Sequence, residues 1–580
     1  MTTTLGSPAA SAPVAVTTEQ INSVPLLVGV MEQMGLRALL DAHVRPHGAW
    51  QGISLSTLVT LWLTHILSER THTLSTLRDW VAARATTFNT LLDLTLRPTD
   101  CTDDRLALVL TQLGDPAIQA ALDATMSQQW VRLYHLPTAT VRFDSTAVSV
   151  YHDPAATDTL LHYGHSKDHR PDLRQFKAML SSLDGLGLPL VCQPVSGQRA
   201  DDGLYIPSYD ATVAALGTSA FLAVGDSKMA ALATRGHLVA HQSGYLCPYR
   251  PPSAGAEIAG WVEQALTRRA RWQRITHRDP RTQEDSLLVE FECWAREQAW
   301  PDPAPGQTHT WTERVIVARS AGHAAAQCQA AERALARVQE ELADLRQPPK
   351  RGRKRYTTEA ELAAVVAAKI AAAHLTGIVS VPLVAETRTE APTRWTVGEV
   401  VVDADAWAAH LERLGWQVYV TNTTAAQYEA AALVMSYRQQ PVQERGFARL
   451  KSRTLHIRPV YLRDETRIAG LLWLLTLALR VLTLTEYRLR TALTAQGGGI
   501  AGLNPANRGQ VTTRPTTERV IGVFTDLTLV TMQASATRTR HVTPLNPTQT
   551  QILQLLGLPA DLYRQLARGS PNCPAHLRES

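Results

Sequence analysis

The segment Thr138–Thr146 reads TATVRFDST and predicts a β-strand. It is rich in β-branched residues that alternate with other types, a pattern typical of strands, and we expect this strand to end at Asp144. Two further strands are expected at Gln175–Leu183 and Pro189–Val195. The sequence DGLG between them indicates a hairpin turn.

A helix and a fourth strand are expected next. Ser208–Leu216 predicts the helix, and Ala220–Gly225 (AFLAVG) predicts a short buried strand followed directly by Asp226. The order is strand, strand, strand, helix, strand, with a carboxylate at the end of the first and last strands. Because a rigid sheet fixes groups at its strand ends, Asp144 and Asp226 could lie side by side and hold Mg²⁺. Each also has a simpler explanation, as a cap of the segment that follows it.

The segment Tyr437–Lys451 reads YRQQPVQERGFARLK. On one continuous helix, Tyr437, Glu444 and Lys451 recur at intervals of seven and share a face with Gln440. This face carries a carboxylate between an aromatic hydroxyl and a cation. A solvated helix face is the alternative interpretation. If the helix packs across the sheet, Glu444 becomes a third carboxylate beside the two aspartates.

The strand order, together with the words FDST, YGHSKDHRPD, VGDS and Y-x2-Q-x3-E-x6-K, resembles the DDE transposases of the IS4 superfamily, in particular its IS1634-type branch. The resemblance covers residues 20–540 or so of the chain. The superfamily signature Tyr-x2-Arg-x3-Glu-x6-Lys maps onto Tyr437, Gln440, Glu444 and Lys451. This chain departs from the signature at Gln440, where arginine is typical.

The resemblance implies an α/β RNase H-like catalytic core within a chain that is mixed α+β overall. It implies that Asp144, Asp226 and Glu444 hold two Mg²⁺ ions, with Mn²⁺ able to substitute. Water would free a 3′ hydroxyl at the transposon end, and that hydroxyl would attack target DNA. The implied partners are double-stranded DNA, as transposon ends and target, and a second copy of the chain in a homodimer.

The resemblance also implies residues that contact DNA. Tyr437, Gln440 and Lys451 would contact phosphates near the cleaved end, although a glutamine supplies no charge there. The loop YGHSKDHRPD would lie beside the active site, with its own cationic groups facing phosphates, and a solvated polar loop is the alternative. The loop residues expected at phosphates are Lys167, His169 and Arg170.

A zinc site is a weaker interpretation of the same loop. His162, His165 and His169 have a spacing that could suggest zinc, but no cysteine or second histidine cluster follows them.

The length of 580 residues predicts several domains. The expected parts are a disordered leader at 1–20, a helical domain at 21–135 that could bind DNA, the first part of the core at 136–226, an insertion at 227–413, the second part of the core with the glutamate helix at 414–495, and a C-terminal tail at 496–580. The apolar run Ile468–Leu484 is interrupted by Arg480, so we expect a buried core helix and not a membrane span.

Composition narrows the protein class. Hydrophobic residues make up 45% and charged residues 19%, so the chain can bury a large core. The net charge of +5 is small for this length, so an anion-binding surface must be local. The six cysteines form no CxxC pair, which argues against a zinc finger or a disulfide framework and fits a reducing cytosol.

The N-terminal segment lacks a secretory pattern, so we expect a bacterial cytoplasmic protein that associates with the nucleoid when on DNA and with no membrane. Three alternatives to a transposase remain open from the sequence. They are a metal-dependent nuclease on the same fold without strand transfer, an inactive DNA-binding derivative, and a hydrolase unrelated to nucleic acid.

Overall fold

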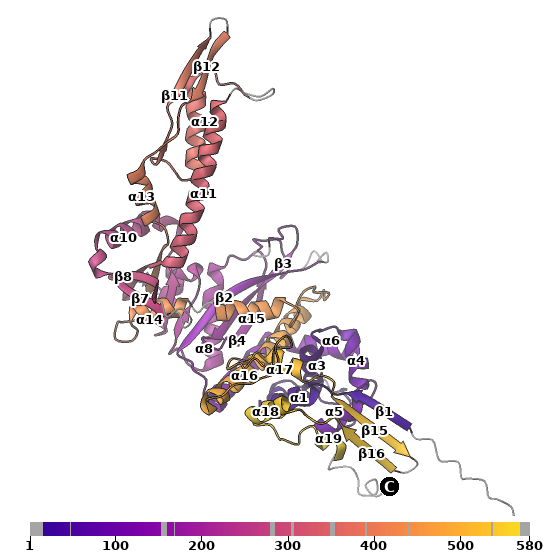
Figure 1. The fold of residues 1–580 in the computed structure, drawn as a ribbon. Coiled ribbons are helices and arrows are strands. Elements are labelled where there is room, and N and C mark those ends of the chain that lie inside the picture. The colour runs from indigo at the N-terminus through magenta and orange to yellow at the C-terminus, as the bar shows by residue number, and fades with distance from the viewer. Residues whose placement is uncertain are drawn as a thin grey trace, which may run out of the picture. The chain divides into compact units, whose positions relative to one another are not determined.

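The structure is a computed structural model, and the chain folds as a mixed α/β protein (Figure 1). It describes residues 15–46, 48–151, 159–166, 169–278, 285–302, 307–347, 354–388, 391–438, 441–534 and 537–568. The chain divides into two compact units. Unit 1 comprises Met1–Gly244 and Tyr437–Ser580, and unit 2 comprises Tyr245–Ser436.

Unit 1 contains four strands in the spatial order β4-β3-β2-β5. Their bounds are β2 Thr140–Ser149, β3 Gln175–Leu183, β4 Leu188–Ser196 and β5 Leu222–Val224. The first three strands are antiparallel neighbours, and β5 runs parallel to β2. Helix α8, Tyr205–Leu216, connects β4 to β5. The predicted order of strand, strand, strand, helix, strand is therefore confirmed.

One strand boundary was predicted wrongly. Strand β2 does not end at Asp144 but continues to Ser149, because the residues after Asp144 keep their pairing with β3 as far as Gln175. The hairpin between β3 and β4 is as predicted. Gly185 and Gly187 adopt φ values of 70° and 72°, which glycine accepts without steric cost.

Helices of the N-terminal region pack in the same compact unit as this sheet and do not form a unit of their own. They are α1 Val24–Gln33, α2 Leu36–His43, α3 Leu55–Glu69, α4 Leu74–Ala82, α5 Ala85–Leu92, α6 Asp103–Leu113 and α7 Pro116–Tyr134. Helices α1 and α2 are separated at Gly35, whose φ of 69° lies outside the helical region.

The longest helix of unit 1 is α16, Glu465–Gln496. It is long and apolar enough to cross a membrane, yet 94% of its most apolar window is buried inside the protein. Arg480, in the middle of α16, is buried and donates to Asp123 Oδ1 of α7 at 2.7 Å and to the carbonyl oxygen of Pro189 at 3.1 Å. Trp473 Nε1 donates to the same carboxylate at 3.0 Å. The prediction of a buried core helix is confirmed.

Residues 15–20 form a strand, so the prediction of a disordered leader at 1–20 is wrong for this part. Strand β1, Ala15–Gln20, pairs with β15, Thr528–Ala534, which in turn pairs with β16, Thr537–Val542. The Glu19 carboxylate accepts hydrogen bonds from the amides of Thr86 and Thr87 at 2.8 and 2.9 Å. The strand is therefore held at both its edge and its end. Residues 1–14 lie outside the described residues.

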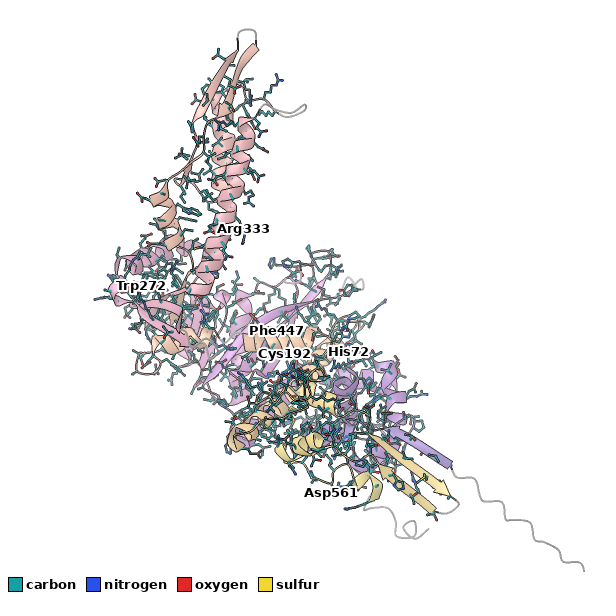
Figure 2. The ribbon with its side chains drawn as sticks, in the orientation of Figure 1. His72, Cys192, Trp272, Arg333, Phe447 and Asp561 are labelled. Atoms are coloured by element: carbon teal, nitrogen blue, oxygen red, sulfur yellow. The ribbon has the colours of Figure 1, made fainter. Side chains whose placement is uncertain are left out.

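The C-terminal part of unit 1 begins after unit 2 and contains α15, the first helix that lies wholly after unit 2 in sequence. Its helices are α15 Pro441–Lys451, α17 Thr517–Val523, α18 Pro547–Leu555 and α19 Gln565–Arg568. In Figure 1, α15 lies across the strands of unit 1, and Figure 2 labels Phe447 on this helix and Cys192 on β4.

Unit 2 has its own strands, in the order β6-β14-β9-β8-β7. Their bounds are β6 Gly244–Pro248, β7 Gln273–Arg278, β8 Asp285–Pro301, β9 Thr308–Ser320 and β14 Trp416–Thr421. Four short strands form two pairs, β10 Val379–Ser380 with β13 Val401–Val402 and β11 Leu383–Arg388 with β12 Ala391–Val397. The helices are α10 Gly255–Thr267, α11 Ala321–Arg346, α12 Glu359–Ala372, α13 Ala404–Glu412 and α14 Ala430–Tyr437.

Helices α11 and α12 of unit 2 run side by side, with β11 and β12 at one end (Figure 1). Val338 and Leu342 of α11 pack with Leu362 and Val366 of α12 in an apolar cluster. The sequence placed an insertion at 227–413. The compact unit instead begins at Tyr245 and ends at Ser436, so it also takes in β14 and most of α14.

Candidate active site

Asp144 and Asp226 occupy equivalent positions on neighbouring parallel strands. The last registered pair of β2 and β5 is Arg142 with Val224. Two residues further along each chain come Asp144, still within β2, and Asp226, just beyond β5. Because neighbouring strands lie about 4.8 Å apart, this register places the backbones of these two half-buried residues next to each other.

Tyr205, the first residue of α8, holds Asp226 through its hydroxyl. Its Oη donates to Asp226 Oδ1 at 2.7 Å and accepts from the Asp226 amide at 3.3 Å. Burial and the charges of Asp226 and Asp144 raise the pKa of Tyr205 well above its usual value. The hydroxyl therefore stays protonated and remains a donor.

The backbone beside Asp226 is shaped for this contact. Asp226 caps the short 3₁₀ helix Ser227–Ala230 by accepting from the Lys228 amide at 2.8 Å, as the capping interpretation expects. A Cβ on Gly225 would lie 2.8 Å from the Tyr205 ring, so only glycine fits there without displacing the tyrosine. Nothing in the sequence alone pointed to Tyr205, because its role depends on how α8 packs.

Helix α15 is docked on the same face of the sheet toward which Asp144 points. Gln443 Oε1 accepts from Ser182 Oγ at 2.5 Å, and its Nε2 donates to the carbonyl oxygen of Leu180 at 3.1 Å. A Cβ on Gly446 would lie 3.9 Å from Leu180 Cδ2, so the Leu180 side chain points at α15. Leu180 is the cross-strand partner of Asp144, and paired residues share a face.

A buried charge network holds the far end of α15. Arg449 is 8% exposed and donates to Glu486 Oε2 of α16 at 2.5 Å and to Glu518 Oε1 of α17 at 2.7 Å. Arg445 adds a 3.4 Å contact to Glu486. The helix that carries Glu444 is thus fixed at one end by neutral hydrogen bonds to β3 and at the other by buried ion pairs.

Glu444 lies next to Gln443 and is exposed, with no hydrogen-bond or ion-pair partner within the described ranges. Lys451, seven residues later, ends α15 and shares the side of the helix that carries Glu444.

The prediction of one continuous helix from Tyr437 to Lys451 is wrong. Helix α14 ends at Tyr437, Arg438 is in a turn, and α15 begins at Pro441. Proline lacks an amide hydrogen and disfavours helical backbone in the residue before it, so Pro441 begins a new helix. Tyr437 is therefore not placed on the face of Glu444 by helical geometry. Gln440 lies outside the described residues.

The loop between β2 and β3 places two of its three predicted DNA contacts at the surface. His169 and Arg170 are exposed, and Lys167 lies outside the described residues. Arg170 binds Asp172 through two hydrogen bonds of 2.8 and 2.7 Å. That contact raises the pKa of Arg170 and lowers the pKa of Asp172.

His162, His165 and His169, all described, do not form a metal-binding group. The zinc interpretation of this loop is not supported.

The donor atoms of the acidic site fit Mg²⁺, which prefers carboxylate oxygens. Asp144 Oδ1 accepts from the Ser145 amide at 2.7 Å. Asp226 Oδ1 accepts two hydrogen bonds, whereas its Oδ2 accepts none from the described residues. The three carboxylates do not all lie within 4.8 Å of one another. Ions of a two-metal site lie about 3.5–4 Å apart, so carboxylates on different ions need not meet that distance.

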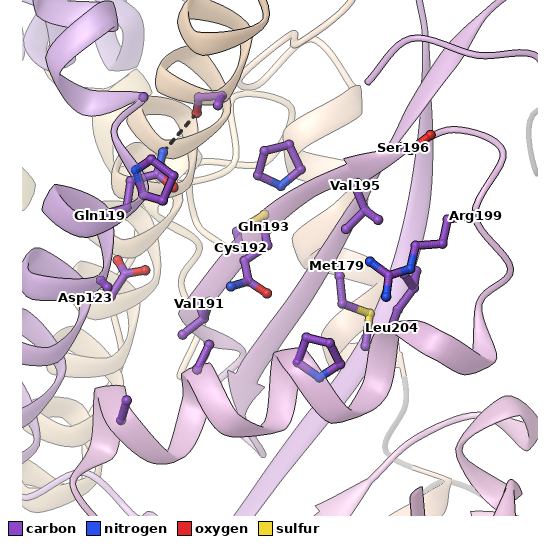
Figure 3. A pocket seen from close by; sticks show the side chains of 18 residues that line it. Gln119, Asp123, Met179, Val191, Cys192, Gln193, Val195, Ser196, Arg199 and Leu204 are labelled. Atoms are coloured by element: carbon purple, nitrogen blue, oxygen red, sulfur yellow. Dashed lines mark hydrogen bonds between the residues drawn. The ribbon is translucent and has the colours of Figure 1, made fainter. Parts of the chain in front are cut away.

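A separate cavity of about 420 Å³ lies beside strand β4 and is lined by residues of α7, α8 and α16. Figure 3 shows Met179 of β3 and Leu204 beside it, together with Asp123 of α7. Asp123 is already paired with Arg480, and burial raises the pKa of Cys192 at the cavity wall to about 11. None of Asp144, Asp226 and Glu444 lines this cavity, so it is distinct from the acidic site.

No protein-family model and no curated protein matches the chain. Among solved structures, the piggyBac transposase synaptic complex with hairpin DNA is similar at a TM-score of 0.33 and 9% identity, over 96% of this chain and 84% of that chain. Neither a family nor an activity follows from a likeness this weak. The assignment of the acidic site therefore depends on the strand order, the register and the docking of α15.

Proposed function

We propose that the chain is a DNA transposase of the DDE type. The observation that carries the proposal is the register of β2 and β5, which puts Asp144 and Asp226 at matching positions of neighbouring strands, with α15 on the face toward which Asp144 points. Glu444 comes from that covering helix, and its carboxylate has no hydrogen-bond or ion-pair partner among the described residues. Three acidic groups on a sheet and its covering helix suit metal-dependent phosphoryl transfer better than a structural role, since no cation of the described chain pairs with Asp226 or Glu444.

The topology supports an RNase H-like core for this site. Three antiparallel strands, a helix and a strand parallel to the first follow one another in unit 1. The signature resemblance to the IS4 superfamily, with Glu444 and Lys451 on one helix, supports that finer assignment.

Asp144, Asp226 and Glu444 would hold two Mg²⁺ ions, or Mn²⁺ in their place. Such ions supply stabilisation of the attacking and leaving oxygens at phosphorus. The Tyr205 hydroxyl donates to Asp226 Oδ1, which would leave Oδ2 as a metal ligand. The hydrogen bonds of Gln443 to β3 would fix the position of the neighbouring Glu444 relative to the sheet. The chain would thereby cut the 3′ ends of its element and join them to target DNA.

The remaining residues of the proposal bind DNA. Lys451 and His169 offer cationic or donor groups, and Arg170 would exchange the carboxylate of Asp172 for a phosphate, which the planar guanidinium also binds through two hydrogen bonds. Tyr437, Gln440 and Lys167 complete the proposed contacts. We further propose a homodimer on the transposon ends and a cytoplasmic location at the bacterial nucleoid.

A cleavage assay tests the proposal. The substrate is a plasmid that carries the chain's gene with its flanking DNA, incubated with purified chain and Mg²⁺. We expect Asp144→Asn, Asp226→Asn and Glu444→Gln each to abolish 3′-end cleavage and keep DNA binding. Glu340→Gln, at an exposed carboxylate of α11, is the matched control and should cleave like the wild type.

The products separate transposition from other activities. Joined donor–target molecules support strand transfer, whereas cut ends without joining indicate a nuclease. Cleavage at the wild-type rate by any of the three acidic variants would remove that residue from the site. Absence of cleavage by the wild-type chain would overturn the proposal.

A further inference from the structure

A second cluster of side chains that can bind metal lies in unit 1 and shares no residue with the acidic site. His237 belongs to α9, Leu232–Ala240, and His241 follows directly as its C-terminal cap. Asp210 faces them from α8. One donor atom from each of the three side chains lies within 4.8 Å of the other two. Among the described residues, no other set of three histidine, cysteine, aspartate or glutamate side chains meets this distance.

The hydrogen bonds orient these donor atoms. His241 Nδ1 lies 2.8 Å from the carbonyl oxygen of His237, which can only accept, so Nδ1 carries the proton and the lone pair of the neutral ring is on Nε2. His237 Nε2 lies 2.7 Å from Asp210 Oδ1. The two imidazole centroids are 4.4 Å apart. A histidine whose other nitrogen donates to a backbone carbonyl is typical of metal ligands.

A buried side chain holds both rings in place. The Tyr209 ring contacts His237 and His241 edge-on, at centroid distances of 5.7 and 5.9 Å. Tyr209 is 1% exposed, and its hydroxyl lies 2.6 Å from Ser243 Oγ. The buried Tyr209 ring therefore fixes one side of both imidazoles, and His241 is exposed to solvent.

We propose that Asp210, His237 and His241 bind a divalent transition metal ion of the zinc class. Two histidines four residues apart on one helix face, completed by a carboxylate, are a nitrogen-rich set that suits Zn²⁺ and not Mg²⁺. Three protein ligands leave the fourth tetrahedral position to water. An ion pair between His237 and Asp210 explains their contact but not the alignment of His241.

Binding requires a small rearrangement. A tetrahedral ion with ligands at about 2.0–2.1 Å sets them about 3.3 Å apart, so the 2.7 Å contact of His237 with Asp210 must widen. Asp210 is exposed and can move by this amount. The ion takes the lone pair of His237 Nε2, so a neutral ring keeps its one proton on Nδ1, whereas a doubly protonated ring releases one proton to solvent.

The bound ion would cross-link the two helices on either side of Asp226 in sequence. Helix α8 begins with Tyr205, which holds Asp226, and α9 follows the turn that Asp226 caps. Zinc at this position would therefore stabilise the surroundings of the acidic site without entering it. The proposal does not depend on a transposase activity.

Cobalt titration tests the site. Co²⁺ is added to the tag-free, metal-depleted full chain in excess Mg²⁺, which keeps the oxygen-rich site filled, and the visible absorption of nitrogen- and oxygen-bound cobalt is recorded. We expect one equivalent to bind and Zn²⁺ to displace it. His241→Asn and Asp210→Asn, both at exposed positions, should each weaken binding by at least about tenfold. His541→Asn, at an exposed histidine of β16, should bind like the wild type.

Thermal unfolding gives a second readout of the same variants. Zn²⁺ should raise the Tm of the wild type and of His541→Asn, and raise it less for His241→Asn. Three results would each overturn the proposal: no cobalt spectrum in the wild type, a thiolate charge-transfer band that assigns the ion to cysteine, or wild-type affinity in both His241→Asn and Asp210→Asn.

Discussion

Replacing Gln443 by leucine removes the two hydrogen bonds that dock α15 on β3. Gln443 is 2% exposed, so neither Ser182 Oγ nor the carbonyl oxygen of Leu180 gains a water in its place. A buried polar group left without its partner costs about 1–3 kcal/mol, and the carbonyl retains a second lone pair. We therefore expect the free energy of unfolding of unit 1 to fall by about 2–4 kcal/mol.

The assay is urea unfolding in which amide hydrogen exchange is the readout. Exchange is measured in peptides from β3 and α15, so unit 2 does not contribute to the signal. Adding Ser182→Ala removes the orphaned hydroxyl and should recover about 1–2 kcal/mol, since replacing both partners by apolar groups is nearly neutral. DNA cleavage should fall with Gln443→Leu, because Glu444 loses its fixed height over the sheet, while DNA binding stays. A cost below about 0.5 kcal/mol, or full cleavage, would refute this reasoning.

Three further changes test other parts of the account. Tyr205→Phe removes a hydrogen-bond donor to the charged Asp226, so the free energy of unfolding in urea should fall by about 1.5–3 kcal/mol and DNA cleavage should become slower. An unchanged cleavage rate would show that the hydroxyl does not position the carboxylate. Arg480→Met leaves the buried Asp123 carboxylate without its ion-pair partner and should lower the free energy of unfolding by about 3–5 kcal/mol. Adding Asp123→Leu to the same chain should restore most of that loss, and two additive losses would contradict a paired site. Burial lowers the pKa of His65 to about 4, so the unfolded chain binds more protons between about pH 4 and 6.5, and stability should fall by up to about 3 kcal/mol as the pH drops through that window. His65→Gln should flatten this dependence, and an equal slope in both proteins would assign it to other groups.

The order of elements around the acidic site could be predicted from the sequence, because each strand carries its own local pattern. The hairpin at Gly185 and the strand preceding Asp226 are examples. The register between β2 and β5 could not be predicted, because it depends on contacts between strands that are far apart in the chain. That register, and not the strand ends, is what sets Asp144 beside Asp226.

The break before α15 was readable in the sequence. Pro441 is a recognised start signal for a helix, and it weighs more than the seven-residue spacing of Tyr437, Glu444 and Lys451. The hydroxyl of Tyr205 and the docking of Gln443 carry no local signal, since both act through tertiary contacts.

The ends of the units were also beyond local reasoning. Strand β1 at Ala15–Gln20 is polar and short, and it is stable as a strand only because β15, from the other end of the chain, pairs with it. The local sequence of this segment favoured disorder, but its pairing with β15 makes it a strand. The same holds for β14, whose pairing with β6 and β9 assigns it to unit 2.

The central claim is that Asp144, Asp226 and Glu444 hold metal together, and iron-directed backbone cleavage tests it most directly. Fe²⁺ replaces Mg²⁺ in the His241→Asn chain, ascorbate and peroxide generate hydroxyl radicals at the bound iron, and the cut peptides are mapped by mass spectrometry. We expect three groups of cuts, in β2 near Asp144, after β5 near Asp226 and in α15 near Glu444, all suppressed by excess Mg²⁺. Cuts near the two aspartates without cuts in α15, or no cuts that Mg²⁺ suppresses, would contradict it.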